Sequence, residues 1–469
     1  MPEKYHIETK PAPPRFTPVG KYAIIDLYEE CARGCKKCVK RKCVYKNYDH
    51  ETDFVRDLVD RPLEFMNDCM NCLMCVQNCT KGALTRIVNP EFRWLGDDYW
   101  KPDQILSIWK QAATGSIPVS GAGYGGPFAG PGFDSMWTDM SEIVRPTRDG
   151  IHGREYISTS VDVGAKPFHL AFDPDGSPLT EQPPLIEIPV PFMMQKPPFG
   201  YLSVNVYLAM ARAAAGMGTF LVLPADEITP ELDEYKDSIV ARIPGGGVDK
   251  YRSLVEGAKL VEIEDSPGAM DDIKKIKDIS PQAIVILRKK LELNIEDDIV
   301  ALAENGVEVV HLFADSHGNV SNGGETEFLK DVIRSIHDRL VDKSLRDMIT
   351  IVASGGIAMA EHMAKAIICG ADFVMLGQPF MLAMECRMCR NCSRDIECPV
   401  DMANIPPEHG ADRITNLAAS WRNQFLEVLG AMGIREVRRL RGEVGRAMFI
   451  EDLERETFEK IFAKKEASV

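Results

Sequence analysis

The chain has 469 residues, of which 45% are hydrophobic and 27% charged, which is typical of a globular protein with a large core. Its formal net charge of −15 argues against a surface that binds nucleic acid or an anionic membrane. No apolar run is long enough to span a membrane and the polar, proline-rich start lacks a secretory signal, so we expect a soluble, cytoplasmic protein.

Twelve of the 13 cysteines fall into three short runs, a pattern that favours metal binding over disulfides. The second run has the spacing Cys-x2-Cys-x2-Cys-x3-Cys, and the first is a looser version of it. In proteins with two such runs, the fourth cysteine of each run binds the other cluster. The two predicted [4Fe–4S] clusters therefore use Cys31, Cys35, Cys38 and Cys79, and Cys69, Cys72, Cys75 and Cys43.

Structural zinc is the alternative, although zinc sites usually contain two Cys-x-x-Cys pairs separated by a longer loop. Neither Cys43 nor Cys79 is followed by the usual proline. The segment from Cys31 to Cys43 is rich in lysine and arginine and has no acidic residue. We interpret it as a docking face for an acidic electron donor or as a means of raising a cluster potential. RNA binding is less favoured, because few aromatic residues accompany these charges.

Two further segments precede the main domain. Residues 121–126 match G-x-G-x-x-G, but Pro127 and Pro131 exclude the helix that a dinucleotide site requires, so we interpret them as a loop. Residues 145–154 contain three arginines and His152, a combination suited to binding a dicarboxylate substrate. A salt-bridged surface loop without a ligand is the alternative.

From about residue 185 to 376, short β-branched segments alternate with amphipathic stretches that end at glycine, and this predicts a (β/α)8 barrel. The close spacing of the fourth, fifth and sixth strands suggests that some connecting helices are degenerate. The expected strands are Leu185–Met193, Thr219–Pro224, Ile239–Ile243, Lys259–Glu264, Ala283–Leu287, Val307–Phe313, Ile349–Ser354 and Asp372–Leu376.

The last two predicted strands end at Ser354-Gly355-Gly356 and at Gly377. Loops at these positions of such barrels commonly bind phosphate through backbone N–H groups, and we favour that role. The alternative is that these glycines only form tight turns.

The third cysteine run follows the last strand and ends in Cys-Pro, which suits a further [4Fe–4S] cluster. A [3Fe–4S] cluster is expected instead if Cys389 is not a ligand. The four cysteines are Cys386, Cys389, Cys392 and Cys398. We expect Cys369, in an apolar helical stretch, to be inert core, and His311, in an apolar strand, to be a hydrogen-bonded core or pocket-wall residue.

The order of these elements, together with SGGIAMAEHMAKAIICGADFVMLGQPFMLAMEC and the tail FLEVLGAMGIREVRRLRG, resembles the FMN-binding, glutamate synthase-like family in its archaeal-type form with an N-terminal ferredoxin module. The resemblance implies an FMN with an iron–sulfur cluster beside it. The implied cofactor-binding residues are Ser354, Gly355, Gly356, Gly377, Gln378, Arg288 and Lys289.

By the same resemblance, one basic residue at the end of the fifth strand faces the isoalloxazine ring. Arg288 and Lys289 point to opposite sides of that strand, so only one of them serves. Lys289 and His317 are the candidate catalytic residues that the resemblance implies.

Three loops depart from the family pattern. KPPFG (Lys196–Gly200) replaces AMSYG after the first strand, VLPADE stands in place of NTGEGG after the second, and EDSPGAM in place of QGAKPG after the fourth. These loops would hold 2-oxoglutarate in the family. The cofactor half is therefore expected to be retained and the substrate half to differ.

We expect an iron–sulfur flavoprotein oxidoreductase that passes electrons through its clusters to FMN and reduces a small acid or imine. The alternative is an electron-transfer subunit of a larger anaerobic redox complex, without a substrate site of its own. Expected partners are an electron donor, such as ferredoxin or an NAD(P)H/flavin subunit, and other subunits. The expected domains are a ferredoxin-like domain (1–100), a pre-barrel segment (101–184), a barrel with the cluster loop 386–398 (185–400) and a helical tail (401–469).

Overall fold

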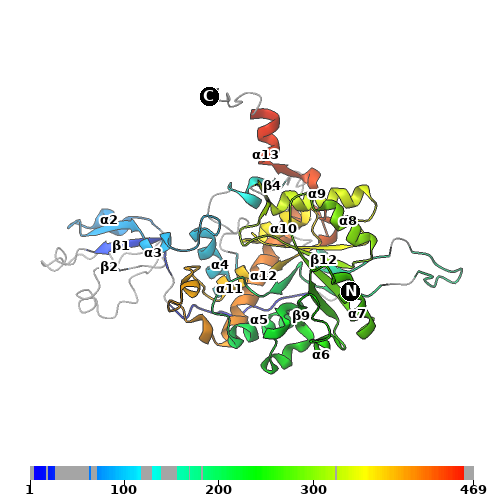
Figure 1. The fold of residues 1–469 in the computed structure, drawn as a ribbon. Coiled ribbons are helices and arrows are strands. Elements are labelled where there is room, and N and C mark those ends of the chain that lie inside the picture. Colours follow the sequence, from blue (N-terminus) through cyan, green and yellow to red (C-terminus); the bar gives the residue numbers. More distant parts are fainter. Residues whose placement is uncertain are drawn as a thin grey trace, which may run out of the picture.

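The computed structural model describes residues 5–16, 19–26, 63–64, 71–117, 129–138, 156–167, 170–180, 183–322 and 325–458. Its centre is a closed barrel of eight parallel strands surrounded by helices (Figure 1), which confirms the predicted barrel. Around the barrel the strands are β7 (Phe192–Gln195), β8 (Leu221–Pro224), β9 (Ile239–Ile243), β10 (Leu260–Glu264), β11 (Ile284–Lys290), β12 (Val309–Phe313), β15 (Thr350–Ser354) and β16 (Phe373–Leu376).

The barrel strands are short, nearly continuous apolar runs, because helices and the barrel interior bury both of their faces. All five residues of β15 are buried, and so are all four of β16. Charged or titratable side chains interrupt these runs on β9, β10, β11 and β12. Those interruptions mark the residues of the site described below.

The first predicted strand, Leu185–Met193, is wrong as a single element, because it comprises two strands with different partners. β6 (Leu185–Ile188) pairs with β5 (Val161–Gly164) in an antiparallel ladder outside the barrel, whereas β7 joins the barrel. Pro189 and Pro191 lie between β6 and β7 and cannot donate a backbone hydrogen bond, so a continuous strand is interrupted there.

The connections that lack a full helix were predicted between the fourth, fifth and sixth strands, but they occur earlier in the barrel. A 3-10 helix, Pro230–Ser238, connects β8 to β9, and the four-residue α6 (Arg252–Val255) connects β9 to β10. The connections around the fifth strand contain complete helices, α7 and α8. The other connecting helices are full length as well. Their bounds are α5 (Val204–Met217), α7 (Ala269–Ile279), α8 (Glu296–Glu304), α9 (Leu329–Asp342) and α10 (Ala360–Ile368).

The long helix α12 (Pro407–Ala431) follows the barrel and packs against α5, α10 and the pre-barrel helix α4 (Pro102–Thr114) (Figure 1). Arg413 of α12 is buried and donates hydrogen bonds to the carbonyls of Ala383 and Ala12, at 2.6 Å and 2.7 Å. One side chain therefore connects the N-terminal segment to the end of the barrel. β17 (Ala447–Phe449) then pairs with β4 (Met136–Thr138), before α13 (Ile450–Leu453).

The N-terminal part contains a three-stranded antiparallel sheet of β1 (Tyr22–Asp26), β2 (Leu63–Glu64) and β3 (Leu84–Val88), with the short helices α2 (Met74–Asn78) and α3 (Pro90–Arg93). Figure 1 places this sheet to one side of the barrel. The predicted ligands Cys31, Cys35, Cys38, Cys43 and Cys69 lie outside the described residues, as do residues 121–126 and 145–154. The ferredoxin-like fold therefore stays a prediction. Within the described ranges, no helix combines the length and the apolar character that crossing a membrane requires.

His337 of α9 is buried near the end of the barrel opposite the strand carboxyl ends, where its Nδ1 accepts a hydrogen bond from Arg346 Nε at 3.1 Å. Burial and the charges of Arg346 and Arg441 lower the pKa of His337 from 6.5 to about 4. The unfolded chain therefore takes up this proton at a higher pH than the folded chain does. The neutral imidazole therefore stabilises the folded chain fully at pH values above the pKa of His337 in the unfolded state. This contribution is lost as the pH falls toward the pKa of His337 in the folded state.

We expect the free energy of unfolding of the native chain to fall by about 2 kcal/mol more than that of His337→Gln between about pH 7.5 and about pH 5. Urea unfolding at the two pH values measures the difference. Equal losses in the two proteins would contradict the assigned pKa direction.

Candidate active site

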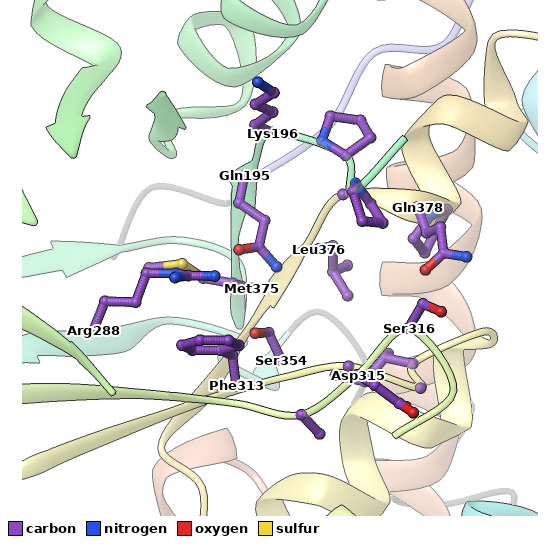
Figure 2. Close-up of a pocket in the computed structure, with 18 of the residues that line it drawn as sticks. Gln195, Lys196, Arg288, Phe313, Asp315, Ser316, Ser354, Met375, Leu376 and Gln378 are labelled. Atoms are coloured by element: carbon purple, nitrogen blue, oxygen red, sulfur yellow. The ribbon is translucent and has the colours of Figure 1, made fainter. Parts of the chain in front are cut away.

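A cavity of about 370 Å³ lies at the carboxyl ends of the barrel strands (Figure 2). Its volume is in the range of small-molecule sites, and barrels of this kind carry their active sites at this end. The end of β7 contributes Gln195, the end of β15 contributes Ser354, and the residues after β16 complete the wall. The cavity is therefore the candidate active site.

Six of the seven predicted cofactor-binding residues line this cavity. They are Ser354, Gly355, Gly356, Gly377, Gln378 and Arg288. Lys289 is not among the lining residues, and its Nζ lies 2.7 Å from Asp265. The Arg288 guanidinium lies 3.6 Å above the centre of the Phe313 ring, which also lines the cavity. Of the two basic candidates on β11, Arg288 is the one that faces the cavity.

Close packing against neighbouring loops also explains why glycine occupies the positions after β15 and β16, in addition to the predicted phosphate role. A Cβ on Gly356, whose φ is +64°, would lie 2.7 Å from Gly318 Cα, and one on Gly355 would lie 2.6 Å from the carbonyl oxygen of Asp315. A Cβ on Gly377 would lie 2.9 Å from the Gln195 carbonyl oxygen. The neighbouring loops thus exclude side chains here, and both interpretations of these glycines stay open.

Residues before the barrel cover the loops that follow the sixth and seventh strands. Trp100 Nε1 donates to the Ser316 carbonyl at 2.9 Å, and the Tyr99 hydroxyl donates to the Gly356 carbonyl. The predicted catalytic His317 lies in this covering layer, where its Nε2 is 2.9 Å from Asp97. It is not among the residues that line the cavity, so the structure does not bring it together with Arg288 and Ser354.

Three buried donors at the cavity wall have no hydrogen-bond partner within the described part of the chain. They are Arg242 Nη2, Arg288 Nε and Gln378 Nε2. A buried donor without a partner costs free energy, and all three donors belong to side chains that line the cavity. The donor set therefore fits a ligand that carries anionic or carbonyl oxygens.

A chain of hydrogen bonds runs beneath the cavity and connects two of its lining residues. Glu262 on β10 accepts from Arg242, and His311 Nδ1 lies 2.6 Å from the other oxygen of Glu262. His311 Nε2 lies 2.7 Å from Ser354 Oγ. Glu262 and His311 are completely buried, as the prediction for His311 required. We call Arg242, Glu262, His311 and Ser354 the barrel relay.

The charges of the relay are fixed by burial and pairing. Burial alone would raise the pKa of Glu262, but Arg242 and His311 lower it from 4.5 to about 2. Burial lowers the pKa of His311 below its ordinary value, against the attraction of Glu262. At neutral pH the relay therefore contains a carboxylate and a neutral imidazole.

Lys196 lines the opposite part of the wall, in the loop after β7 that departs from the family pattern. Its ammonium forms an ion pair with Glu227, which also accepts a hydrogen bond from Tyr207. Burial and the Glu227 carboxylate raise the pKa of Tyr207, so its hydroxyl stays protonated. Two of the divergent loops are thus connected by one charged pair.

The last cysteine run begins just beyond α11 (Gln378–Ala383), whose first residues line the cavity. Burial raises the pKa of the Cys386 thiol to about 12, and Cys389, Cys398 and Cys392 act on it in the same direction, so the four sulfurs lie near one another. Next to this run, Glu385 is held by the Arg15 backbone N–H at 2.6 Å and by Arg15 Nε at 3.2 Å. Cys369 is completely buried, as predicted for inert core.

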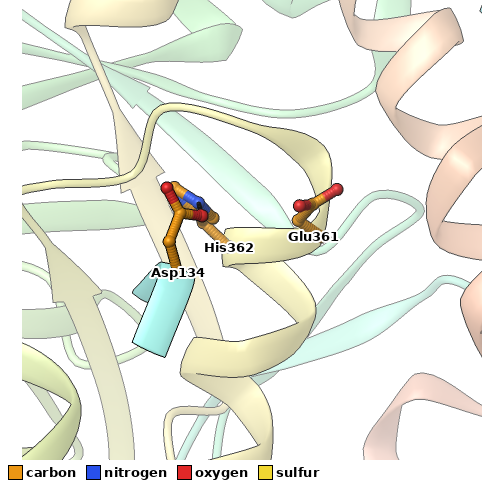
Figure 3. A group of neighbouring side chains, drawn as sticks. All are labelled: Asp134, Glu361 and His362. Carbon is orange, nitrogen blue, oxygen red and sulfur yellow. Dashed lines mark hydrogen bonds and ion pairs between the residues drawn. The ribbon is translucent and has the colours of Figure 1, made fainter. Parts of the chain in front are cut away.

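Among the described residues, one group of three ligand atoms lies within 4.8 Å of one another, formed by Asp134, Glu361 and His362 (Figure 3). His362 Nδ1 accepts from the Ala358 N–H, and Nε2 then donates to Asp134 at 3.0 Å. No lone pair of the imidazole is left for a metal. We interpret this group as a structural connection between the residues before β4 and α10.

The chain is similar to known proteins over most of its length. The sequence model of a family described as the conserved region in glutamate synthase matches residues 240–435. The chain is 27% identical over 480 residues to an archaeal-type glutamate synthase (NADPH) of Dehalococcoides mccartyi, across 89% of this chain and 93% of that protein. It is 25% identical to an archaeal glutamate synthase (NADPH) of Archaeoglobus fulgidus, across 91% and 94% of the two chains. A solved mandelate oxidase with an FMN adduct has a TM-score of 0.44 at 14% identity, across 72% and 90%.

Sequence reasoning missed Arg242 and Glu262 as residues of the site. The available signal was a charged residue in the middle of an apolar strand, as in IVARI and LVEIE, because such residues are rarely buried without a partner.

Proposed function

We propose that the chain, which is similar to archaeal-type glutamate synthases over most of its length, is an FMN-dependent oxidoreductase whose flavin lies in the cavity at the carboxyl ends of the barrel strands. The observation that carries the proposal is the set of unpartnered donors on Arg242, Arg288 and Gln378. FMN supplies acceptors of the required kind, since it has phosphate and ring carbonyl oxygens. When bound, it supplies the redox chemistry of the reaction.

The residues of the chain would bind and orient this group. The loops at Gly355, Gly356 and Gly377 would approach the phosphate through their backbone. Arg288 would place a positive charge beside the ring, which favours any negative charge that develops there on reduction. Tyr99 and Trp100, by fixing the loops over the cavity, would limit the access of water.

The proposal includes a [4Fe–4S] or [3Fe–4S] cluster on the last cysteine run. The spacing Cys-x2-Cys-x2-Cys-x5-Cys-Pro of this run suits such a cluster better than the paired Cys-x-x-Cys pattern of zinc sites. The six residues of α11 span about 9 Å and connect the cavity wall to the start of this run, so the path for an electron is short.

Two further [4Fe–4S] clusters would lie in the N-terminal part. Of their ligands, Cys72, Cys75 and Cys79 lie on or beside α2, and the other five fall outside the described residues. The positively charged segment from Cys31 to Cys43 would receive an acidic electron donor, such as ferredoxin or an NAD(P)H/flavin subunit. Both relatives are named for NADPH, which supports an NADPH-linked source of electrons.

The substrate would be a small acid or imine, with 2-oxoglutarate and ammonia as the first candidates because the relatives are glutamate synthases. One observation favours the alternative, an electron-transfer subunit without its own substrate. Lys196, a cation of the divergent substrate side, is already paired with Glu227 and is not free to bind a carboxylate.

We expect anaerobically reduced protein to reoxidise its flavin when 2-oxoglutarate and ammonia are added together, but not when either is added alone. Flavin absorbance in a stopped-flow instrument measures this reaction. Flavin that stays reduced with this pair and with other small 2-oxo acids, but is reoxidised by a co-purifying subunit, would establish the electron-transfer alternative.

We expect Arg288→Gln to weaken FMN binding at least about tenfold, because a charge-assisted hydrogen bond to the ring is lost. Lys289→Gln is the matched control, since it changes the neighbouring residue that pairs with Asp265, and its affinity should stay within about twofold of the native value. Fluorescence titration of FMN into the flavin-free protein measures both. A larger loss for Lys289→Gln would contradict the orientation of this strand end.

We expect anaerobically purified protein to contain about twelve iron atoms and about one FMN per chain if all three runs bind four-iron clusters. Cys392→Ser should remove about four of them, whereas Cys389→Ser should leave a cluster only if the third site is of the three-iron type. Metal analysis and electron paramagnetic resonance check these contents. Zinc in place of iron would contradict the cluster assignment.

A further inference from the structure

Glu262 and His311 have no role in the binding scheme above, although they connect two residues that line the cavity, Arg242 and Ser354. Arg242 and Ser354 line the cavity, and the two residues between them, Glu262 and His311, are completely buried. Barrel interiors are usually filled by branched apolar side chains, and burying charged groups carries a large desolvation cost. A polar chain at this place therefore calls for a function.

The hydrogen atoms of the relay can be assigned from its chemistry. The Glu262 carboxylate is ionised and can only accept, so His311 Nδ1 must carry a hydrogen and donate to it. Burial keeps the imidazole neutral, so Nε2 has a lone pair and no hydrogen. The Ser354 hydroxyl, 2.7 Å away, must then donate its hydrogen to Nε2.

This assignment determines what Ser354 offers to the cavity. Its single hydrogen is directed toward His311, so the oxygen can only accept from a ligand. With the opposite imidazole tautomer, Nε2 would donate to Ser354, and the hydroxyl hydrogen would be free to point into the cavity. Glu262 excludes that arrangement, because its carboxylate requires a hydrogen on Nδ1.

We infer that Glu262 is a positioning residue that acts through His311 to fix the Ser354 hydroxyl as a hydrogen-bond acceptor for an N–H or O–H group of the cavity ligand. That this ligand is FMN rests on the proposed function. The two ends of the relay are then complementary, since Arg242 offers a donor with no partner and Ser354 offers an acceptor. The cavity therefore favours a ligand with a hydrogen-bond acceptor near Arg242 and a hydrogen-bond donor near Ser354.

A double-mutant cycle on the full-length protein tests the inference, with FMN titrated into the flavin-free form. Ser354→Ala and Glu262→Gln should each weaken FMN binding about three- to tenfold, which corresponds to one hydrogen bond. The losses should not add in the double variant, because Glu262 acts on the ligand through Ser354 as well as through its ion pair with Arg242. Ser354→Thr, which keeps a hydroxyl, should restore most of the affinity.

Glu308→Gln is the matched control for Glu262→Gln. Glu308 is also largely buried, but it binds Lys277 at the opposite end of the barrel, so FMN affinity should not change. Unchanged affinity in Ser354→Ala, or losses that add in the double variant, would overturn the inference.

A second measurement does not depend on the folding of Glu262→Gln. In native protein with ¹³C-labelled histidine, the nuclear magnetic resonance signal that moves in Ser354→Ala is assigned to His311. It should report a neutral ring with hydrogen on Nδ1, and a ring with hydrogen on Nε2 would overturn the inference. Native protein that binds no FMN contradicts the proposed function instead, and the histidine tautomer then decides whether the relay is arranged as inferred.

Discussion

The site depends on one buried interaction, in which the Glu262 carboxylate binds Arg242 with one oxygen and His311 with the other. Removing one member of a buried ionic group typically costs about 3–5 kcal/mol, because the remaining charge is left without a partner. These three side chains are therefore interdependent. Their strands, β9, β10 and β12, belong to one closed barrel, so the pairing also fixes the spacing of the cavity wall above them.

The barrel could be predicted because its strands are buried on both faces and read as short apolar runs between amphipathic segments. The pairing of strands could not be read in the same way. Leu185–Ile188 looks like the start of a barrel strand, yet it pairs with Val161–Gly164, and nothing in an apolar run identifies its partner. Pro189 and Pro191 were the available signal for the interruption. The connections were misjudged because a short 3-10 helix and a loop look alike in sequence.

For the site, the sequence showed which residue types lie at the ends of the strands. It did not show which of these side chains point into the cavity. Arg288 and Lys289 are adjacent, and only the closed barrel places Arg288 beside Phe313 and Lys289 beside Asp265. His317 was predicted to be catalytic, but it contacts Asp97, which is far away in the sequence. The relay was missed for the same reason, because Glu262, His311 and Ser354 come from three distant strands. The glycine loops and cysteine runs were recognisable as candidates, since both patterns depend on local spacing in the sequence.

The contact between Arg15 and Glu385 joins the first residues of the chain to the segment just before the last cysteine run. Arg15 also donates to the Val400 carbonyl at 2.8 Å, just beyond that run, so both ends of the cysteine loop are attached to the N-terminal segment. These partners are 370 residues apart in the sequence, so Arg15 leaves the ribosome long before Glu385. The loop that carries the last cysteine run can therefore be attached at both ends only after the whole barrel has been translated, which makes its closure a late step in folding.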